Sequence, residues 1–587
     1  MRSLTRTGLV VLAAILIVLL LSQITQVYGS AGISQNDGKV TLTLIGWVAN
    51  TQDQPVGEAE VRVFIGGEQQ GLTVAGEEVK AARTSAEGFY IADLNLSPAM
   101  LEGDTLAVVV SKPGYRVTRQ GFAQQRIAHA ADHYYTRVPD VVLPRVFNPA
   151  FFIATGIFFV VFGLISFNVL HETIAAFVGA AAMLAVSYFF GSFNADYWII
   201  SFHRAIHFID FDVIFLLLTM MIFMAVMSQT GIFQWLAFRA FRLAGGNAFL
   251  VTAVLVTITA ATSAVLNDTT VMLLMAPVSI QIALALKIRP ASIVVPEVLA
   301  SNIGGAATLI GTPPNTIIGS YVGLSFNQFL AHMLPIAVMA MVILLFMTRW
   351  LYRGEFGREE TSASGALVKQ LEAGARITDP ALLRKSLFLF GVTMVLFFIE
   401  DLFHMPPAVV AILGSTALLL WVRPDVGEML REVDWTTLVF FMCLFMMVGA
   451  VQEVGLIQVI AESVKNLAGD NLLVATLLVI WVSALASAIV ANIPFTAAMV
   501  PVTVYLTHTI PGAENNVLYW ALALGAGLGG NATYIGSAPN IVASGILDRA
   551  GFRLKFADFS KVGAPVTFVT LLMPTLWILL RYFVLKF

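Results

Sequence analysis

The sequence predicts an all-α polytopic membrane protein, an inverted repeat with two re-entrant hairpins and two broken helices, plus a small N-terminal β-sandwich ectodomain. Hydrophobic residues make up 58% of the 587 residues and charged residues 12%, about half the share of charge in soluble proteins. Apolar segments of about 20 residues, the length that crosses a bilayer, recur after residue 146. The stretch "GGAATLIGTPPN" at 304–315 recurs as "GGNATYIGSAPN" at 529–540, with eight of twelve positions identical.

Charge and cysteine content exclude several classes of function. The formal net charge of −3 offers no basic excess for a nucleic-acid partner. Cys443 is the single cysteine, so a disulfide within the chain is impossible and a cysteine metal site is not expected. The eight histidines form no HExxH-type pattern, and no metal is predicted apart from sodium as a coupling ion.

The N-terminal part of the chain is predicted to be exported. Residues 1–30 are a signal peptide or a signal anchor, since Arg2 and Arg6 precede the apolar run at 8–22. Residues 31–146 alternate apolar and polar side chains between turn residues, as in "KVTLTLIGWVAN", which is typical of short antiparallel strands. "TSAEGFYIADL" followed by "SKPGY" resembles transthyretin-like sandwiches. A ligand-binding domain and a structural cap both fit this pattern.

From residue 147 onward the sequence predicts membrane spans in two halves. Repeat 1 covers 147–351 and repeat 2 covers 386–587, with a polar cytoplasmic linker at 352–385. Most basic loops fall on one side, which we take as cytoplasmic, so the β-sandwich is expected outside the cell (inner) membrane. The expected spans lie near 150–169, 172–191, 211–229, 328–349, 386–403, 406–422, 435–453 and 563–582.

The two halves overlay when the chain is shifted along itself by a constant offset. The offset places Asp210 on Asp434, and the same offset places "SAVLNDTTVMLLMAP" at 263–277 on "SAIVANIPFTAAMVP" at 487–501. One added residue aligns the two glycine-rich stretches. Lys287 and Arg289 closely follow the first of these segments, whereas "HTIPGAENN" follows the second and the next basic loop comes one crossing later. We therefore expect the halves to lie in opposite orientations in the membrane.

The glycine-rich stretches cannot continue a helix smoothly. In hydrocarbon, non-helical backbone survives only where it lines a protein- or water-filled site. Residues 304–314 and 529–539 are therefore predicted to break two spanning helices, and "LNDTT" and "VANIP" to form hairpin tips that face the breaks. An inverted repeat with such breaks is typical of secondary transporters.

At these residues the sequence resembles the ion transporter superfamily. This superfamily includes citrate and divalent-anion symporters, arsenite pumps, sodium/proton antiporters and the melanosomal P protein, whose layout also begins with an exported domain. The resemblance covers about 150–585 and rests on "SNIGGAATLIGTPPN" and "GLGGNATYIGSAPN". It implies a homodimer in which a transport domain moves like an elevator against a fixed scaffold.

The hairpin tips depart from part of this family pattern. In the sodium symporters, the tip is Ser-Asn-Thr ten residues before a proline, and it holds sodium and the substrate carboxylate. The same offset here gives Asn267-Asp268-Thr269 and Ala491-Asn492-Ile493. The Asn-Asp tip is closer to the arsenite pumps, whereas Thr312 in "IGTPPN" matches the anion symporters. Anion and cation substrates both stay open.

The predicted substrate- and ion-binding residues are polar groups and glycines of the tips and breaks. Hydroxyl and amide groups are neutral ligands for sodium or oxyanions, and the glycines free backbone carbonyls. The set is Ser263, Asn267, Asp268, Thr269, Thr270, Asn302, Gly304, Gly305, Thr308, Thr312, Asn315, Ser487, Asn492, Thr496, Asn531, Thr533, Ser537 and Asn540.

Two acids in this region are candidate proton carriers. Asp268 lies at bilayer depth, where an acid costs roughly 2.5–3.5 kcal/mol and is functional by default. The alternative is a structural acid that accepts hydrogen bonds from backbone N–H groups. Glu297 precedes Asn302 by five residues and is either a proton carrier or a residue at the cytoplasmic headgroups.

The amides of the two halves do not match. Asn302 aligns with Gly527 and Ala306 with Asn531, so we expect two unequal sites. Asn315 and Asn540 are also expected to cap the half-helices that follow the breaks. For Asp210 and Asp434, helix capping or a place at an interface is favoured over a role in transport.

The predicted function is secondary active transport of a small ion, namely an anion, organic acid or metalloid oxyanion, coupled to Na⁺ or H⁺. The expected partners are the ion, the lipid bilayer and a second copy of the chain, with no cofactor and no enzymatic activity. The alternative is a Na⁺/H⁺ antiporter in which Asp268 exchanges a proton for a cation. A sensor that binds ligands through the β-sandwich is a third class, which the two copies of the break disfavour.

Overall fold

The computed structural model describes residues 40–585, apart from 51–54, 75–76, 86, 97–105, 113, 123–125, 131–132, 144–146, 168, 246, 357–371 and 373. The chain divides into two compact units, residues 1–146 and 147–587. The predicted signal segment at 1–30 lies outside the described residues, as does the part of the predicted linker from 357 to 371.

The first unit contains two β-sheets. One sheet has the order β10-β11-β1-β7-β4-β5 with β12 beside β1, and the other has the order β3-β2-β8-β9 with β6 beside β2. Side chains that point inward from both sheets form one buried core, which includes Leu44, Val63 and Val108. The strands are β1 (Val40–Asn50), β2 (Glu60–Ile65), β3 (Glu68–Gln69), β4 (Leu72–Val74), β5 (Glu77–Val79), β6 (Ala82–Arg83), β7 (Phe89–Leu96), β8 (Leu106–Ser111), β9 (Thr118–Phe122), β10 (Arg126–Ala130), β11 (His133–Arg137) and β12 (Val141–Leu143).

The predicted antiparallel arrangement of this unit is wrong for β1. This strand pairs antiparallel with β7 but parallel with β11 and β12. The expectation rested on short turns, which join antiparallel neighbours, whereas parallel strands need a long connection. Because β1 and β11 are separated by most of the unit's sequence, their pairing could not be inferred from turns.

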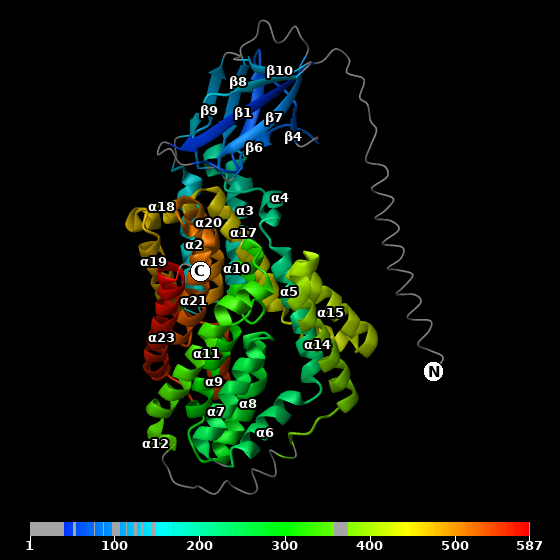
Figure 1. Ribbon diagram of the computed structural model, residues 1–587, viewed down its shortest axis with the longest axis vertical. Coiled ribbons are helices and arrows are strands. Elements are labelled where there is room, and N and C mark those ends of the chain that lie inside the picture. Colours follow the sequence, from blue (N-terminus) through cyan, green and yellow to red (C-terminus); the bar gives the residue numbers. More distant parts are fainter. Residues whose placement is uncertain are drawn as a thin grey trace, which may run out of the picture. The chain divides into compact units, whose positions relative to one another are not determined.

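The second unit is helical (Figure 1). Its first half contains α2 (Pro149–Ser166), α3 (Glu172–Ala185), the π-helix η2 (Val186–Gly191), the 3₁₀ turn η3 (Ala195–Tyr197), α4 (Phe202–His207), α5 (Phe211–Ser228), α6 (Ile232–Leu243), α7 (Ala248–Ser263), α8 (Asp268–Ala285), α9 (Ala291–Gly305), α10 (Pro313–Val322), α11 (Phe326–Leu351) and α12 (Arg353–Phe356). Its second half contains α14 (Pro380–Phe403), α15 (Pro407–Val422), α16 (Val426–Glu432), α17 (Trp435–Glu453), α18 (Leu456–Ala468), α19 (Leu472–Ile489), α20 (Asn492–Thr509), η4 (Ala513–Asn515), α21 (Val517–Gly529), η5 (Gly530–Ala532), α22 (Ala538–Arg549), α23 (Phe556–Ile578) and the π-helix η6 (Leu579–Val584).

Nine helices among the described residues are long and apolar enough to cross a membrane, which makes this a multi-pass membrane protein. They are α2, α3 with η2, α5, α8, α11, α14, α17, α19, and α23 with η6. Seven match predicted spans. The eighth predicted span, near 406–422, corresponds to α15, an apolar helix of 16 residues that is shorter than the nine. Helices α8 and α19, which the sequence analysis assigns to hairpins, reach 18 residues each.

The order of the helices repeats between the halves. With the offset that places Asp210 on Asp434, the first residues of α5, α7 and α8 fall on the first residues of α17, α19 and α20. With the one added residue, the start of α10 falls on the start of α22. The predicted capping by Asp210 and Asp434 is confirmed, because their carboxylates accept from the N–H groups of Val213 and Thr437. In Figure 1, α6 to α9 lie at one end of the helical unit and α18 to α20 toward the other.

In each half, two helices pack so closely that only glycine fits at the point of contact. A Cβ atom on Gly304 of α9 would lie 2.1 Å from the carbonyl oxygen of Ala260 on α7. A Cβ atom on Gly529 of α21 would lie 2.4 Å from the Cα of Ala484 on α19. Both atoms would clash with backbone, which cannot move aside locally. These glycines therefore set the spacing between the broken helices and their neighbours.

We predict that Gly304→Ala and Gly529→Ala destabilise the folded protein by about 1–3 kcal/mol, the usual cost of overpacking. The measurement is the thermal unfolding midpoint of the purified protein in detergent. Gly391→Ala is the matched control, because a Cβ atom at this position in α14 has nothing within 4 Å. Equal midpoints for all three variants would contradict the role of close packing.

Candidate functional site

Both predicted breaks are present. Helix α9 ends at Gly305 and α10 begins at Pro313, and in the second half α21 ends at Gly529 and α22 begins at Ala538. The chain between them is non-helical apart from the short turn η5. Proline in the first turn of each following half-helix suits its start, since proline lacks the N–H that a first turn leaves unused.

The backbone of each break is bonded to the preceding pair of helices. The N–H of Asp268, the first residue of α8, donates to the carbonyl oxygen of Gly311 at 3.3 Å. At the matched position, the N–H of Asn492 donates to the carbonyl oxygen of Gly536 at 3.0 Å. The structure thus brings each predicted tip onto the predicted break of its own half.

Two threonines make a second matched contact between tip and break. The Thr533 hydroxyl donates to the carbonyl oxygen of Ala488 at 2.6 Å, and the Thr308 hydroxyl donates to that of Ala264. Both acceptors lie near the ends of α19 and α7, where helical carbonyls lose their partners. The hydroxyls of Thr308 and Thr533 are therefore committed to the protein and hold the tip in place.

The predicted capping role of Asn315 and Asn540 is wrong. The Asn315 amide nitrogen donates to the carbonyl oxygens of Ala306 and Thr308, at 3.1 and 2.8 Å. The Asn540 amide nitrogen likewise donates to the carbonyl oxygens of Gly530 and Thr533, at 2.9 and 2.8 Å. Their amides bond carbonyls of the break because these acceptors have no helical donor of their own.

The side chain of Asn302 joins the two halves. Its amide nitrogen lies 2.7 Å from Asn531 Oδ1, 3.0 Å from Ser537 Oγ and 2.9 Å from Asn540 Oδ1. Two N–H groups thus face three acceptors, all buried. Asn531 in turn donates to the carbonyl oxygen of Leu299 at 3.3 Å. The two amides that the sequence places at unmatched positions meet here in one cluster.

The mirror position in the other half contains no amide pair. A Cβ atom on Gly527 would lie 3.7 Å from the Cβ of Ala306, so the residues aligned with Asn302 and Asn531 also meet. Thr312 Oγ1 and Asn315 Oδ1, which align with the oxygens that Asn302 binds, are buried and have no partner among the described residues. The first break therefore keeps two unsatisfied oxygens that the second break has used.

Asp268, whose backbone N–H bonds the first break, carries a buried carboxylate. It is 1% exposed, and its Oδ1 accepts from the Thr269 N–H at 2.7 Å and from the Thr269 hydroxyl at 3.3 Å. Asn267 caps α8 by accepting from the N–H groups of Thr269 and Thr270. The backbone N–H of Asp268 donates to the carbonyl oxygen of Gly311, which directly precedes Thr312 in the chain.

A buried serine that the sequence analysis missed supports this tip. The Ser301 hydroxyl lies 2.8 Å from Ser263 Oγ and donates to the carbonyl oxygen of Asp268 at 3.1 Å. Two sequence features could have identified Ser301. It directly precedes Asn302, and the matched position of the second half has the apolar residue Ala526. In the second half, Ser487 donates to the carbonyl oxygen of Ala526, and Thr496 bonds only within its own helix.

Glu297 of α9 is fully buried and bonded to α7. Its Oε1 accepts from the Thr259 hydroxyl at 2.8 Å, and its Oε2 has no partner among the described residues. Asp268 and Glu297 are thus two buried acids of the first half. At the matched position of Glu297 the second half has Leu522.

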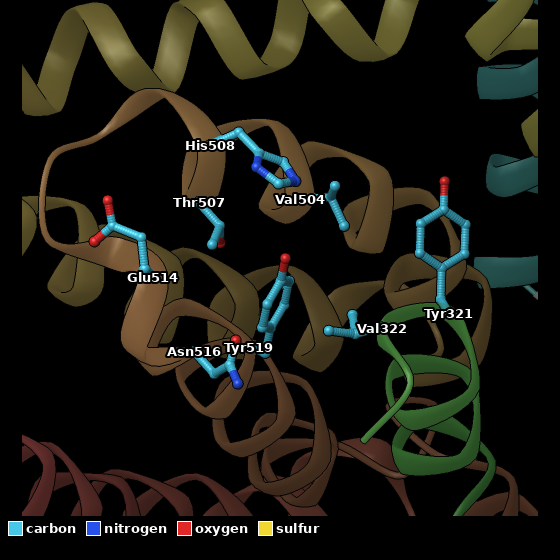
Figure 2. A pocket seen from close by; sticks show the side chains of 8 residues that line it. All are labelled: Tyr321, Val322, Val504, Thr507, His508, Glu514, Asn516 and Tyr519. Carbon is cyan, nitrogen blue, oxygen red and sulfur yellow. The ribbon is translucent and has the colours of Figure 1, made fainter. Parts of the chain in front are cut away.

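A cavity of about 470 Å³ lies at the ends of α10, α20 and α21 (Figure 2). The hydroxyl end of Tyr519 points into it between Thr507 and Val504, while Glu514 and His508 stand at its exposed edge. No residue of either break lines it, so it is not the site built by the tips and breaks.

A multi-pass helical unit with two matched breaks, each bonded to the tip of a neighbouring helix pair, defines a membrane transporter. The chain belongs to the citrate transporter family, whose model matches residues 162–525. It is 37% identical over 439 residues to an uncharacterized transporter of Mycobacterium tuberculosis, which covers 74% of this chain and 99% of the relative. The family resemblance seen in the sequence is confirmed.

Two further proteins are similar. The human P protein is 33% identical over 508 residues, which covers 74% of this chain and 60% of the relative. The crystal structure of the Alcanivorax borkumensis YdaH transporter matches at 13% identity with a TM-score of 0.49, over 70% of this chain and 98% of that chain.

We predict that Asn302→Ala lowers the free energy of unfolding by about 1–3 kcal/mol, because it strips the donor from buried acceptors. Thermal unfolding in detergent measures the change. Asn327→Ala is the control, since Asn327 also donates two side-chain bonds, at 2.9 Å each, but these bonds are exposed to solvent. A loss for Asn302→Ala no larger than for the control would refute the bridging role.

Proposed function

We propose that the protein is a secondary active transporter of a small organic acid or other small anion, driven by H⁺ or Na⁺. The observation that carries the proposal is the matched bonding of tips to breaks, Asp268 to Gly311 and Asn492 to Gly536. Two bonded breaks in one chain are the arrangement that alternating-access transporters use for their sites. The family description, citrate transporter, supports an organic acid as substrate.

The proposal includes an inverted repeat that moves like an elevator. The repeated helix order, the opposite placement of α6–α9 and α18–α20, and the one-sided basic loops support opposite orientations of the halves. The short helices α9, α10, α21 and α22, together with the pairs α7–α8 and α19–α20, then form the moving part. We extend the proposal to a homodimer in the cell membrane, with the N-terminal β-sandwich outside.

The coupling ion is proposed to bind at the first break. Thr312 Oγ1 and Asn315 Oδ1 are buried oxygens without a partner among the described residues. Asp268 supplies a buried carboxylate on the tip whose backbone bonds this break. Oxygen ligands with one carboxylate suit a small cation, and a proton on Asp268 neutralises the same charge. At the second break Asn302 occupies the matched oxygens, which supports a single coupling site in the first half.

A cation/proton antiporter is the second candidate. Among the described residues, the buried charged side chains are Asp268, Glu297 and Glu400, with no buried lysine or arginine. An anion alone would have no positive partner in this interior, whereas a cation would have three carboxyl groups. The organic-acid proposal therefore requires that the anion enters with its coupling cation.

We predict that Asp268→Asn lowers transport into proteoliposomes at least about tenfold, a loss equivalent to about 1.4 kcal/mol, and abolishes its dependence on pH and sodium. Asparagine retains an oxygen for the Thr269 N–H, so the tip should stay folded. Asp548→Asn, an exposed acid at the end of α22, serves as the control. Unchanged transport with unchanged pH and sodium dependence would remove Asp268 from the coupling site.

A ligand screen separates the two candidate functions. We predict that citrate raises the thermal unfolding midpoint only when sodium or low pH is also present, because the proposed anion enters with its coupling cation. At about 100 times its dissociation constant, a bound ligand stabilises the folded protein by about 2.7 kcal/mol. Sulfate, arsenite and amino acids are tested in parallel. Stabilisation by sodium alone, with proton release and no response to any anion, would favour the antiporter.

A further inference from the structure

A second cavity, of about 340 Å³, lies where five helices of the membrane unit end or begin. It is bordered by the start of α5, the end of α10, the start of α11, the end of α14 and the start of α15. Leu309 and Thr316 form the wall nearest the first break. Apart from Leu309 and Thr316, no residue of the first tip or break lines this cavity. It is therefore distinct from the contacts between tip and break.

The lining of this cavity is acidic. Asp212, Glu400 and Asp401 contribute carboxyl groups, and His404 is the one basic side chain among the lining residues. Asp401 is held in position, because its Oδ2 accepts from the Ser325 hydroxyl at 3.2 Å and from the Asn327 amide at 2.9 Å. A cavity wall with three carboxyl groups and no lysine or arginine attracts a cation.

Glu400 supplies the observation that points to a ligand. The residue is 1% exposed, and its Oε1 accepts from the N–H of Phe326, the first residue of α11, at 2.7 Å. Its Oε2 is buried and has no hydrogen-bond partner among the described residues. Glu400 is also one of the residues that line the cavity. A buried carboxylate oxygen without a partner is costly unless a proton or a cationic group neutralises it, and a protonated amine supplies such a group.

The remaining lining defines the kind of cation. No three His, Cys, Asp or Glu side chains converge as metal ligands in the described part of the chain. The volume falls within the range of small-molecule sites. Leu216, Leu324, Met405 and Pro407 add apolar side chains, so the lining is divided between acidic and apolar residues. A cation with an apolar body fits this division better than a bare metal ion.

We propose that this cavity binds small organic amines, with the protonated ammonium group on Glu400 and the apolar body against Leu216, Leu324 and Met405. Such a ligand contacts α10 and α11 on one side and α14 and α15 on the other. If the transport domain moves as proposed above, the amine holds these helices together and inhibits transport. Amine binding itself does not depend on the proposed function.

The test measures thermal unfolding of the purified full-length protein with increasing hexylammonium, hexanol or hexanoate. Hexylammonium is expected to raise the midpoint in a saturable way, whereas hexanol and hexanoate are not. Glu400→Gln, which retains the oxygen for Phe326, should weaken the apparent affinity at least about tenfold. Glu514→Gln, at the edge of the other cavity, should leave it unchanged.

An equal response to hexanol, or unchanged affinity in Glu400→Gln, would overturn the proposal. If Glu400→Gln fails to fold, Asp212→Asn replaces it, because Asp212 is exposed at the start of α5. This variant is expected to weaken hexylammonium binding several-fold, and no change would count against the site. Failure of amine binding together with intact citrate- or sodium-linked stabilisation would leave the transport proposal standing.

Discussion

The helical unit depends on one constraint: every backbone polar group in its apolar interior needs a partner. The two breaks interrupt the helical pattern, and both solve the problem with the same donors. An asparagine amide bonds two carbonyls of the loop, a threonine hydroxyl bonds the neighbouring helix end, and the first N–H of the next helix bonds a glycine carbonyl. These bonds join the tip and the break of each half.

The backbone groups of the two breaks have matching hydrogen-bond partners. The differences between the halves therefore come from the polar side chains that do not take part in these bonds. Asn302 reaches from the first half and occupies three acceptors of the second. Glycine at the position of Gly527 leaves the matching oxygens of Thr312 and Asn315 unused. Matched backbone bonds thus accompany unequal polar sites, and the buried acids Asp268 and Glu297 both lie in the first half, which has the unused oxygens.

The distribution of charge follows the same division. Buried carboxyl groups at Asp268, Glu297 and Glu400 are not matched by buried lysine or arginine among the described residues. Each has at least one oxygen bonded to a backbone or hydroxyl donor, which fixes its direction. An interior of this kind favours positive ions over anions.

The sequence by itself determined the membrane class, the helix order, the positions of both breaks and the tips that meet them, because apolar length, glycine-proline clusters and a repeat at a constant offset can all be read along the chain. It also singled out Asp268 and the unmatched amides. It could not place Asn302 against Asn531, bury Glu297, turn Asn315 and Asn540 toward the break carbonyls or pair β1 with β11. Those outcomes depend on which segments meet although they lie far apart in the chain, or on which way a side chain turns within a packed interior. Only the tertiary structure decided them, because the sequence offers several possible hydrogen-bond partners for each polar group and does not show which one lies nearby in the fold.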